Sequence, residues 1–485
     1  MKIRDFFKNF KKSWEGVKYM NNAELNEEII IQYINQFKGS KERDLMLTGD
    51  RYYRVDNDIL NRRITKVVRG QEIEETYKAN NKLAHAKYKG LVDEKINYLL
   101  GKPYTLKCEN KQYVETVNRI LNPKKFKYQL SGLGIEASNK DKGWLHVYID
   151  ETGQFKTLII PSEQCIPVWV DNSHEELKAM IRVYDNVIWK NSKSERITNV
   201  EVWTPTGVQY YIKKYNSLIP CLDKNYLEGD VVSHYSKNGV WTSWGKVPFI
   251  AFKNNRVELP DIKFVKSLID NYDLTRSETA NFVEDVKNLI FILKDYGGED
   301  INEFMRDLNE NRAIKIDEDG DVTTLNPTMD VSALKEHYEQ LIKDITDSGQ
   351  GVNVDIDKFG NNPSGIALGF MYAKLDLKCN ALEDEFSFAF ENLMYFVNRY
   401  MQEMNLGSYN EEIEIVFNRN MKINEAEAIQ NCNNSVGLVS DDTVLSNHPW
   451  VKDVEKEKKL KEEQDKATKT FTDKVPIPQE EKEDK

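Results

Sequence analysis

The sequence contains few of the residues on which catalytic and metal-binding sites depend. Its 485 residues include 6 histidines and 5 cysteines, and no histidine lies in an HExxH or equivalent metal-binding spacing. Nucleophile-elbow and GxGxxG patterns are also absent. The cysteines are far apart and form no CxxC pair, so we interpret them as buried free thiols in a reducing compartment. They are Cys108, Cys165, Cys221, Cys379 and Cys432. An enzyme is therefore the minority hypothesis.

The sequence also lacks long apolar runs and an excess of basic residues. No stretch approaches the roughly 18 residues that span a bilayer, and no signal-peptide core is present, so we expect no membrane partner. There are 79 acidic against 68 basic residues, which gives a net charge of -11. This charge argues against a surface that holds nucleic acid by neutralising phosphates. The length predicts two to four structural units, and hydrophobic residues at 40% suffice for packed cores.

Two acidic stretches are candidates for metal binding. The stretch DIDKFG, from Asp355, begins like a calcium loop, but Phe359 occupies the third ligand position and Ile366 the twelfth. The residues at 317–321 could form the two-metal site of a nuclease, whereas an acidic hairpin tip explains the same pattern. We favour the hairpin tip and expect no metal and no other cofactor.

Hydrophobic periodicity separates a helical region from a sheet region. Residues 21–125 carry apolar positions that recur every three or four residues, which predicts helices. One stripe runs from Leu83 to Leu99 and is ended by Gly101 and Pro103. From about 127 to 250 the period changes to two, with short β-branched and aromatic runs between turn signals. This pattern predicts an antiparallel sheet.

Two amphipathic helices are predicted after the sheet region, over 260–289 and 330–349, on either side of a small αβ insert. The insert contains the run IFILKDY, a short helix near INEFMRDL and a hairpin that turns at Asp319 and Gly320. A loop rich in Gly, Asn and Asp follows. A long helix is then expected from Ser364 to about Met404, apolar on much of its circumference and so buried on several sides. The strand EIEIVF, further helices and a charged tail complete the chain.

The first 20 residues are basic and aromatic. Phe6, Phe7, Phe10 and Trp14 recur at helical spacing among six basic residues. Such a pattern is compatible with a helix on a membrane surface. We favour an arm that docks on its own protein or on a partner.

The order of these parts, and the amino-acid sequences of three long stretches, resemble those of the portal proteins of long-tailed bacteriophages. The stretches are YKANNKLAHAKYKGLVDEKINYLLGKP, VPFIAFKNNRVELPDIKFVKSLIDNYDLTRSETANFVED and NPSGIALGFMYAKLDLKCN. The resemblance runs from about residue 40 to 450. It implies a mainly α fold with α+β parts, arranged as the wing, stem, clip and crown of a ring oligomer.

The resemblance assigns each part of the chain to a portal region. The ranges are 1–40 for the N-terminal basic arm, 41–255 for the wing (a helical part, then an antiparallel β part), 256–289 for stem helix one, 290–329 for the clip, 330–349 for stem helix two, 350–363 for the tunnel loop, 364–419 for the long wing helix and a strand, 420–460 for the crown, and 461–485 for a charged, disordered tail. The clip strands are too short for a stable sheet alone, so we expect them to pair with a neighbouring subunit.

The resemblance further implies a passive channel through which double-stranded DNA is packaged and ejected. A ring of twelve subunits would sit at the portal vertex of the virion, after assembly in the host cytoplasm. The expected partners are the terminase large subunit, whose motor hydrolyses ATP, a head-completion or adaptor protein, and the major capsid and scaffolding proteins. Twelve helices about 10 Å apart have a centre line about 120 Å around, and subtracting about 10 Å of helix thickness leaves a hole about 28 Å wide. A duplex about 20 Å wide would pass.

The tunnel loop supplies the candidate site residues for contact with DNA. They are Asn353, Asp355, Asp357, Lys358, Phe359, Asn361 and Asn362. Together with Gly349, Gly351 and Gly360 they would form a deformable collar, in which Lys358 and Phe359 touch the duplex. Three alternatives stay open: an ordinary surface connection at this loop, a metal-dependent phage DNA-processing enzyme, and a soluble cellular scaffold.

Overall fold

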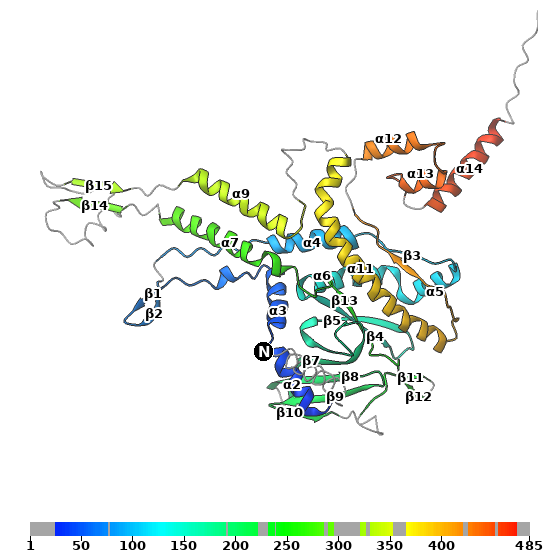
Figure 1. Cartoon of the computed structure of the whole chain (residues 1–485), viewed down its shortest axis with the longest axis horizontal. Helices are drawn as coiled ribbons and strands as arrows, with labels where there is room; N and C mark the ends of the chain where they lie inside the picture. The colour runs from blue at the N-terminus through cyan, green and yellow to red at the C-terminus, as the bar shows by residue number, and fades with distance from the viewer. Residues whose placement is uncertain are drawn as a thin grey trace, which may run out of the picture. The chain divides into compact units, whose positions relative to one another are not determined.

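The structure is a computed structural model of the chain (Figure 1). It describes residues 25–75, 78–190, 193–221, 231–237, 239–285, 290–294, 321–325, 330–352, 365–420, 425–451 and 454–472. The chain forms two compact units. The first comprises Met1–Gly351 and Leu375–Asn420, and the second comprises Val352–Lys374 and Met421–Lys485. About half of the fold is helical, with several small sheets, which agrees with the expected mainly α fold with α+β parts.

The first unit begins with a helix that packs on a sheet. Helix α2 (Glu27–Lys38) starts where the side chain of Asn26 accepts a hydrogen bond from the backbone N–H of Ile29 at 2.9 Å. Its apolar face, including Ile30 and Ile34, is wholly buried in the core cluster formed with the sheet. The other helices that precede or cover the sheets are α3 (Lys41–Tyr53), η1 (Asp58–Asn61), α4 (Lys87–Leu100), α5 (Lys111–Leu121), α6 (Pro123–Lys140) and η2 (Ser162–Gln164).

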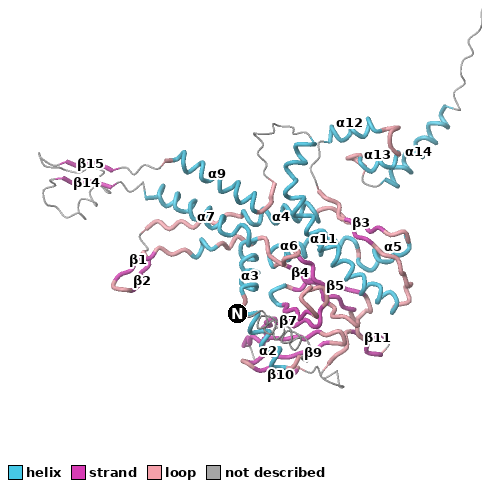
Figure 2. The backbone as a smooth tube through the Cα atoms, viewed as in Figure 1, coloured by secondary structure: helices cyan, strands magenta, loops and turns pink. Residues whose placement is uncertain are grey.

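Two antiparallel sheets form the β part, as the period of two predicts. The five-stranded sheet has the order β10-β9-β8-β7-β6 and the three-stranded sheet has the order β13-β4-β5. Helix α6 packs on the three-stranded sheet (Figure 2). The strands are β4 (Lys142–Ile149), β5 (Phe155–Ile160), β6 (Cys165–Trp169), β7 (Leu177–Lys190), β8 (Lys193–Trp203), β9 (Val208–Lys214), β10 (Ser217–Pro220) and β13 (Phe249–Lys253), with the small pair β11 (Tyr235–Lys237) and β12 (Val240–Thr242) beside them.

Three segments depart from the predicted pattern. Within the region expected to be helical, β1 (Thr65–Val68) and β2 (Gln71–Glu74) form a hairpin that turns at Arg69 and Gly70, both with positive φ. Strand β3 (Thr105–Lys107) lies in the same region and pairs with β16 (Glu414–Val416). Conversely, α6 occupies a segment that was expected to be strand from residue 127, because Asn122 caps it and Pro123 stands in its first turn.

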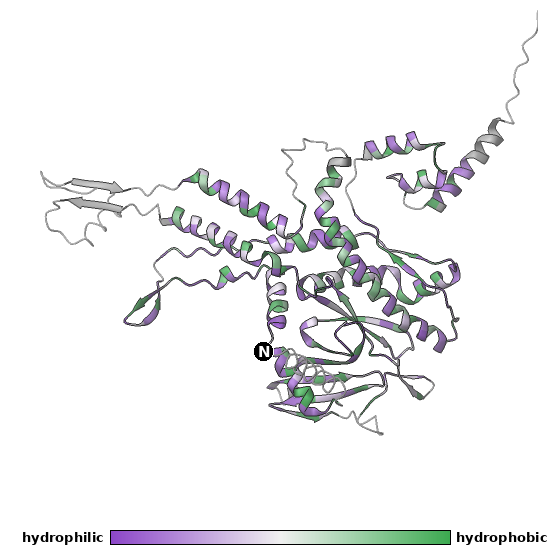
Figure 3. Ribbon diagram, viewed as in Figure 1, coloured by the Kyte–Doolittle hydropathy of each residue, from purple (hydrophilic) through white to green (hydrophobic). Residues whose placement is uncertain are grey.

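The two predicted rods are present and pack on each other. Helices α7 (Ile262–Asp285) and α9 (Val331–Ser348) contact lengthwise, and both alternate hydrophobic and hydrophilic residues along their length (Figure 3). The ring of Tyr338 on α9 lies against Tyr272, with 6.2 Å between ring centroids, and under the guanidinium of Arg276 at 4.8 Å. Beyond the rods, β14 (Ile290–Lys294) pairs antiparallel with β15 (Asp321–Leu325). The expected turn at 319–320 and the short helix before it lie outside the described residues.

Helix α11 (Gly365–Glu403) is the long helix predicted from Ser364 to about Met404. Its part in the first unit is buried on several sides, as expected, because aromatic neighbours reach it from different elements. Phe386 meets Phe252 of β13, Phe390 meets Phe126 of α6, and Phe396 meets Trp244 before β13. In the second unit, α12 (Glu425–Ser435) and α13 (Asp441–Asn447) form at predicted helices. Helix α14 (Val454–Thr472) extends into the range 461–485, which was expected to be a disordered tail, so that expectation is wrong as far as Thr472.

The five cysteines are free thiols. Cys165, Cys379 and Cys432 are buried as expected, and burial raises the pKa of the Cys379 thiol to about 12. The expectation of burial is wrong for Cys221, which is exposed, and only partly right for Cys108, which is half-buried. Cys221 directly follows the edge strand β10, so it lies at the rim of the sheet.

Candidate functional site

The seven loop residues predicted to meet DNA lie outside the described residues, which stop at Val352 and resume at Gly365. The structure therefore describes the framework around that loop. Two of the glycines assigned to the deformable collar belong to this framework. A Cβ on Gly349 would lie 2.5 Å from Leu91 Cδ1, and one on Gly351 would lie 2.6 Å from Leu91 Cδ2. Gly349 and Gly351 are buried against α4 and serve close packing there.

A buried ionic network joins the adjacent ends of the two rods. Asp261, directly before α7, receives a hydrogen bond from Lys95 Nζ of α4 at 2.6 Å and one from Asn254 Nδ2 at 2.9 Å. Lys378 of α11 lies 3.1 Å from the same carboxylate and donates to the carbonyl of Gly349, at the end of α9, at 2.8 Å. We call these five residues the stem-root network. It fixes α7 and α9 to α4 and α11.

In the stem-root network, the charge state of each ionisable side chain depends on the charges of the others. Burial alone would raise the pKa of Asp261, but Lys378 and Lys95 reverse this effect and hold the pKa well below its usual range. Desolvation lowers the pKa of Lys95 to about 8, although Asp261 opposes this shift. Two buried cations thus share one carboxylate, and the carboxylate is the member whose removal leaves the most uncompensated charge.

A second ionic cluster holds the turn that leads into the first rod. Glu258 has a positive φ of 53°, and its carboxylate contacts Lys142 Nζ at 2.8 Å, His174 Nδ1 at 2.9 Å and Lys253 Nζ at 3.0 Å. Burial would raise the pKa of Glu258, but the surrounding cations, with Lys142 first, lower it to about 2. The turn before α7 is thereby fixed to the sheet body.

An extended segment runs along the buried face of α7 on a ladder of hydrogen bonds. The backbone N–H groups of Asn81, Leu83 and His85 donate to Asn281 Oδ1 at 2.6 Å, Ser277 Oγ at 3.0 Å and Asp273 Oδ1 at 3.1 Å, respectively. The three acceptors are four residues apart on α7 and buried. This polar ladder attaches one arm of the β1–β2 hairpin to the rod, so the helix predicted from Leu83 begins only at Lys87.

The rods carry more acidic than basic residues. Helix α7 contains three basic residues against five acidic ones, and α9 contains two against four. On α9, Lys335, Glu336, Glu339 and Lys343 are exposed. A wall of this charge neutralises few phosphates, so a polyanion beside it is not retained strongly.

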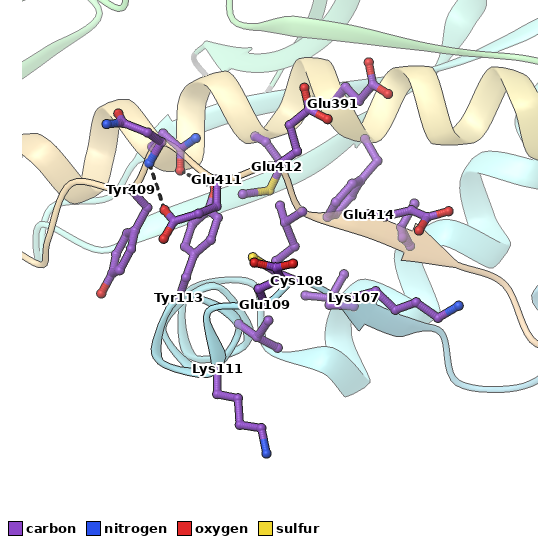
Figure 4. A pocket seen from close by; sticks show the side chains of 18 of the residues that line it. Lys107, Cys108, Glu109, Lys111, Tyr113, Glu391, Tyr409, Glu411, Glu412 and Glu414 are labelled. Atoms are coloured by element: carbon purple, nitrogen blue, oxygen red, sulfur yellow. Dashed lines mark hydrogen bonds between the residues drawn. The ribbon is translucent and has the colours of Figure 1, made fainter. Parts of the chain in front are cut away.

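A groove lies beside α5 in the first unit (Figure 4). It has a volume of about 1410 Å³ and is walled by the β3–α5 segment, by α11 and by residues 409–415. Its floor is apolar, with Phe390, Met394 and Ile415. Glutamates line its opening. No sequence pattern predicts this groove, since its walls are brought together by the pairing of β3 with β16 across about 300 residues of chain.

The described residues contain no group of three or more His, Cys, Asp or Glu side chains placed to hold a metal ion. Residues 317–320 of the candidate nuclease site lie outside the described part of the chain, and Asp321 is the first residue of β15. Among the helices that the structure describes, none is long and apolar enough to cross a membrane.

Comparisons with known proteins agree on one family. Residues 36–470 match the family described as phage portal protein, SPP1 Gp6-like. The portal protein of Bacillus phage SPP1 is 33% identical over 85% of this chain and 82% of its own length. The portal protein of Clostridium phage phiCD119 is 33% identical over 86% of this chain and 92% of its own length. A solved chain described as "Neck of empty GTA particle computed with C6 symmetry" aligns with 10% identity and a TM-score of 0.42, over 74% of this chain and 88% of that one.

Proposed function

Because the chain belongs to the SPP1 Gp6-like family of phage portal proteins, we propose that twelve copies close into a ring at the portal vertex of the virion and surround a channel for double-stranded DNA. Membership of the family makes the chain a structural component of the virion that assembles as a homo-oligomer. The number twelve, and assembly in the host cytoplasm, belong to the proposal.

The stem-root network is the observation that carries this proposal. A channel wall must keep its shape while DNA moves past it, and this requires rods that do not pivot at their base. Lys378 contacts both Asp261, before α7, and Gly349, after α9, so one side chain fixes the ends of both rods. The acidic balance of the rods supports sliding of the duplex, since few phosphates would be neutralised along the wall.

The contact with DNA is assigned to the loop between α9 and α11. Lys358 and Phe359 are the touch points that we propose, with Asn353, Asp355, Asp357, Asn361 and Asn362 as their polar surroundings. The buried packing of Gly349 and Gly351 on Leu91 supports a fixed base for this loop. Any deformation of the collar would then be confined to residues 353–362.

The β14–β15 end of the rods is the proposed docking site for the terminase large subunit and later for the head-completion or adaptor protein. Among the described residues, β14 and β15 pair only with each other, and an isolated two-stranded sheet is only marginally stable in water. Pairing of these edges with the neighbouring copy would stabilise this end of the ring and present a continuous surface. The wing would face the major capsid and scaffolding proteins.

Electron microscopy of the purified protein tests the assembly, and a packaging assay tests the loop. We expect rings with a central hole, and chains that remain monomeric at micromolar concentration would refute the ring. Lys358→Ala combined with Phe359→Ala should reduce packaged DNA while rings form normally. Lys335→Ala on the exposed face of α9 is the matched control, since it removes one positive charge from the rod. Normal packaging by the double variant would remove the proposed role of the two residues.

A further inference from the structure

The groove of Figure 4 has the form of a binding site for an amphipathic segment. Apolar side chains from three elements meet in its floor: α11 contributes Phe390 and Met394, and the strands β3 and β16 contribute Leu106 and Ile415. The stacked rings of Tyr113 and Tyr409, 4.6 Å apart, close one end. Hydrophobic grooves of this kind take amphipathic helices, whose apolar side chains lie on the floor.

The charge around the groove specifies a basic occupant. Six exposed glutamates and two exposed lysines, Lys107 and Lys111, line the groove, so acidic residues prevail by four. Five of the glutamates form no ion pair or side-chain hydrogen bond among the described residues: they are Glu109, Glu115, Glu391, Glu412 and Glu414. The sixth, Glu411, accepts a hydrogen bond from Asn110 at 3.0 Å. Several carboxylates of like charge around one apolar floor repel each other, and a cationic ligand would relieve this repulsion.

The chain itself contains a segment of matching chemistry. Residues 1–20, MKIRDFFKNFKKSWEGVKYM, carry six basic residues against two acidic ones. Phe6, Phe10 and Trp14 fall on one face at helical spacing, and Lys8 and Lys12 fall on the opposite side. Aromatic side chains on one face suit the apolar floor, and the lysines suit the glutamates of the opening.

The position at which the described chain begins indicates which copy supplies this segment. Five residues separate Met20 from Asn26, the cap of α2, and the six steps between them span at most about 20 Å when the chain is fully extended. Helix α2 packs on the five-stranded sheet, and α3, α6 and α5 follow one another between it and the groove. Neighbouring helices lie about 8–10 Å apart, and Figure 1 shows α2 at the lower edge of the unit and α5 at its right side. The separation of α2 from the groove therefore exceeds the reach of residues 21–25, which favours a neighbouring copy as the source of the segment.

We propose that the N-terminal segment of each subunit, residues 1–20, binds in the acidic groove of a neighbouring copy and acts as a strap between subunits. The aromatic face lies on Phe390 and Met394, and the lysines pair with the glutamates of the opening. The inference rests on the homo-oligomeric assembly described under Proposed function. It adds a contact in which each copy completes the binding site of the next.

A disulfide test uses the half-buried Cys108, which lines the groove. Ser13 lies on the aromatic face of the segment, so Ser13→Cys in a Cys221→Ser background should form a disulfide with Cys108 of the next copy under mild oxidation. The expected result is a series of covalently linked dimers and higher species on non-reducing gels. Glu15→Cys, on the opposite face, should cross-link at least tenfold less, and Cys108→Ser should abolish the products.

Exchange of the charges between the groove and the segment tests whether the glutamates recognise the lysines. Reversal of three glutamates, Glu391→Lys, Glu412→Lys and Glu414→Lys, should reduce cross-linking at least tenfold. Lys8→Glu, Lys11→Glu and Lys12→Glu in the same chain should restore it.

Reversal of two exposed glutamates elsewhere, Glu151→Lys and Glu175→Lys, is the control and should change nothing. Native mass spectrometry of the same samples reports ring formation separately. Rings without cross-links, or a disulfide formed only within single chains, would overturn the strap and leave the proposed channel intact. Loss of rings in the unmodified protein would instead refute the channel.

Discussion

Replacement of Lys378 by Met should loosen the end of the second rod. Methionine keeps most of the aliphatic length, so the variant removes two interactions and little packing. These are the hydrogen bond to the carbonyl of Gly349 at 2.8 Å and the ion pair with Asp261 at 3.1 Å. Asp261 keeps Lys95 and Asn254, so no isolated buried charge remains. A hydrogen bond to a charged group contributes about 1.5–3 kcal/mol, and we expect a local loss of about 2–3 kcal/mol.

Amide hydrogen exchange measures this loss where it occurs. The N–H groups of Gly349 and Gly351 donate to carbonyls of the last turn of α9, both at 2.9 Å. With each 1.4 kcal/mol equal to a factor of ten, their exchange should accelerate about 30-fold to 150-fold in the Lys378→Met protein.

Two further variants are compared with Lys378→Met by the size of their loss of stability. Asp261→Asn should cost more, about 3–5 kcal/mol, because it leaves two buried cations without an anion. Lys263→Met, on the exposed side of the same rod, should stay within about 0.5 kcal/mol of the parent protein. Equal exchange in the Lys378→Met and Lys263→Met proteins would show that the stem-root network does not fix the rods.

Three further predictions follow from single sites. Desolvation is the main cause that raises the pKa of the buried Asp141 from 3.8 to about 8. Between these pH values the folded state holds a proton that the unfolded state releases. The stability of the fold therefore falls as pH rises from about 4 to 8. Asp141→Asn should flatten this slope and raise the melting temperature at pH 8. Gly351→Ala should destabilise the protein by about 1–3 kcal/mol through its contact with Leu91, and Leu91→Ala in the same chain should recover part of the loss in thermal unfolding. Ser277→Ala should cost about 1–3 kcal/mol because a backbone amide loses its partner, whereas Ser267→Ala on the exposed face of α7 should be neutral by the same assay.

The long helices could be predicted from the sequence because their periodicity is sustained. The α7, α9 and α11 patterns run for several turns each, and their observed ends fall within a few residues of those expected. Shorter elements were predicted less well. Helix α6 was taken for strand although Asn122 and Pro123 form a start signal, and the β1–β2 hairpin was taken for helix although Gly70 and its β-branched neighbours indicate a turn between strands.

The connections that position the candidate site could not be predicted. The stem-root network draws Lys95, Asp261 and Lys378 from segments more than 100 residues apart, and nothing local in the sequence pairs them. The extended conformation of residues 81–85 has the same origin, because its hydrogen-bond acceptors lie on α7, about 200 residues later. In isolation the apolar spacing at Leu83 favours a helix, and the tertiary partner decides otherwise.

The polar ladder on α7 matches two repeats of slightly different length, one of the extended chain and one of the helix. Two residues of extended chain advance about 6.6 Å, and four residues of helix advance about 6.0 Å, so the two scales drift apart by about 0.6 Å per rung. Three rungs tolerate this drift within ordinary hydrogen-bond lengths, while longer ladders would lose contact. The three rungs that the structure contains are followed directly by α4, at Lys87. A one-residue insertion between Asn81 and His85 would turn every second amide away from the rod, and the hairpin would lose its alignment with α7.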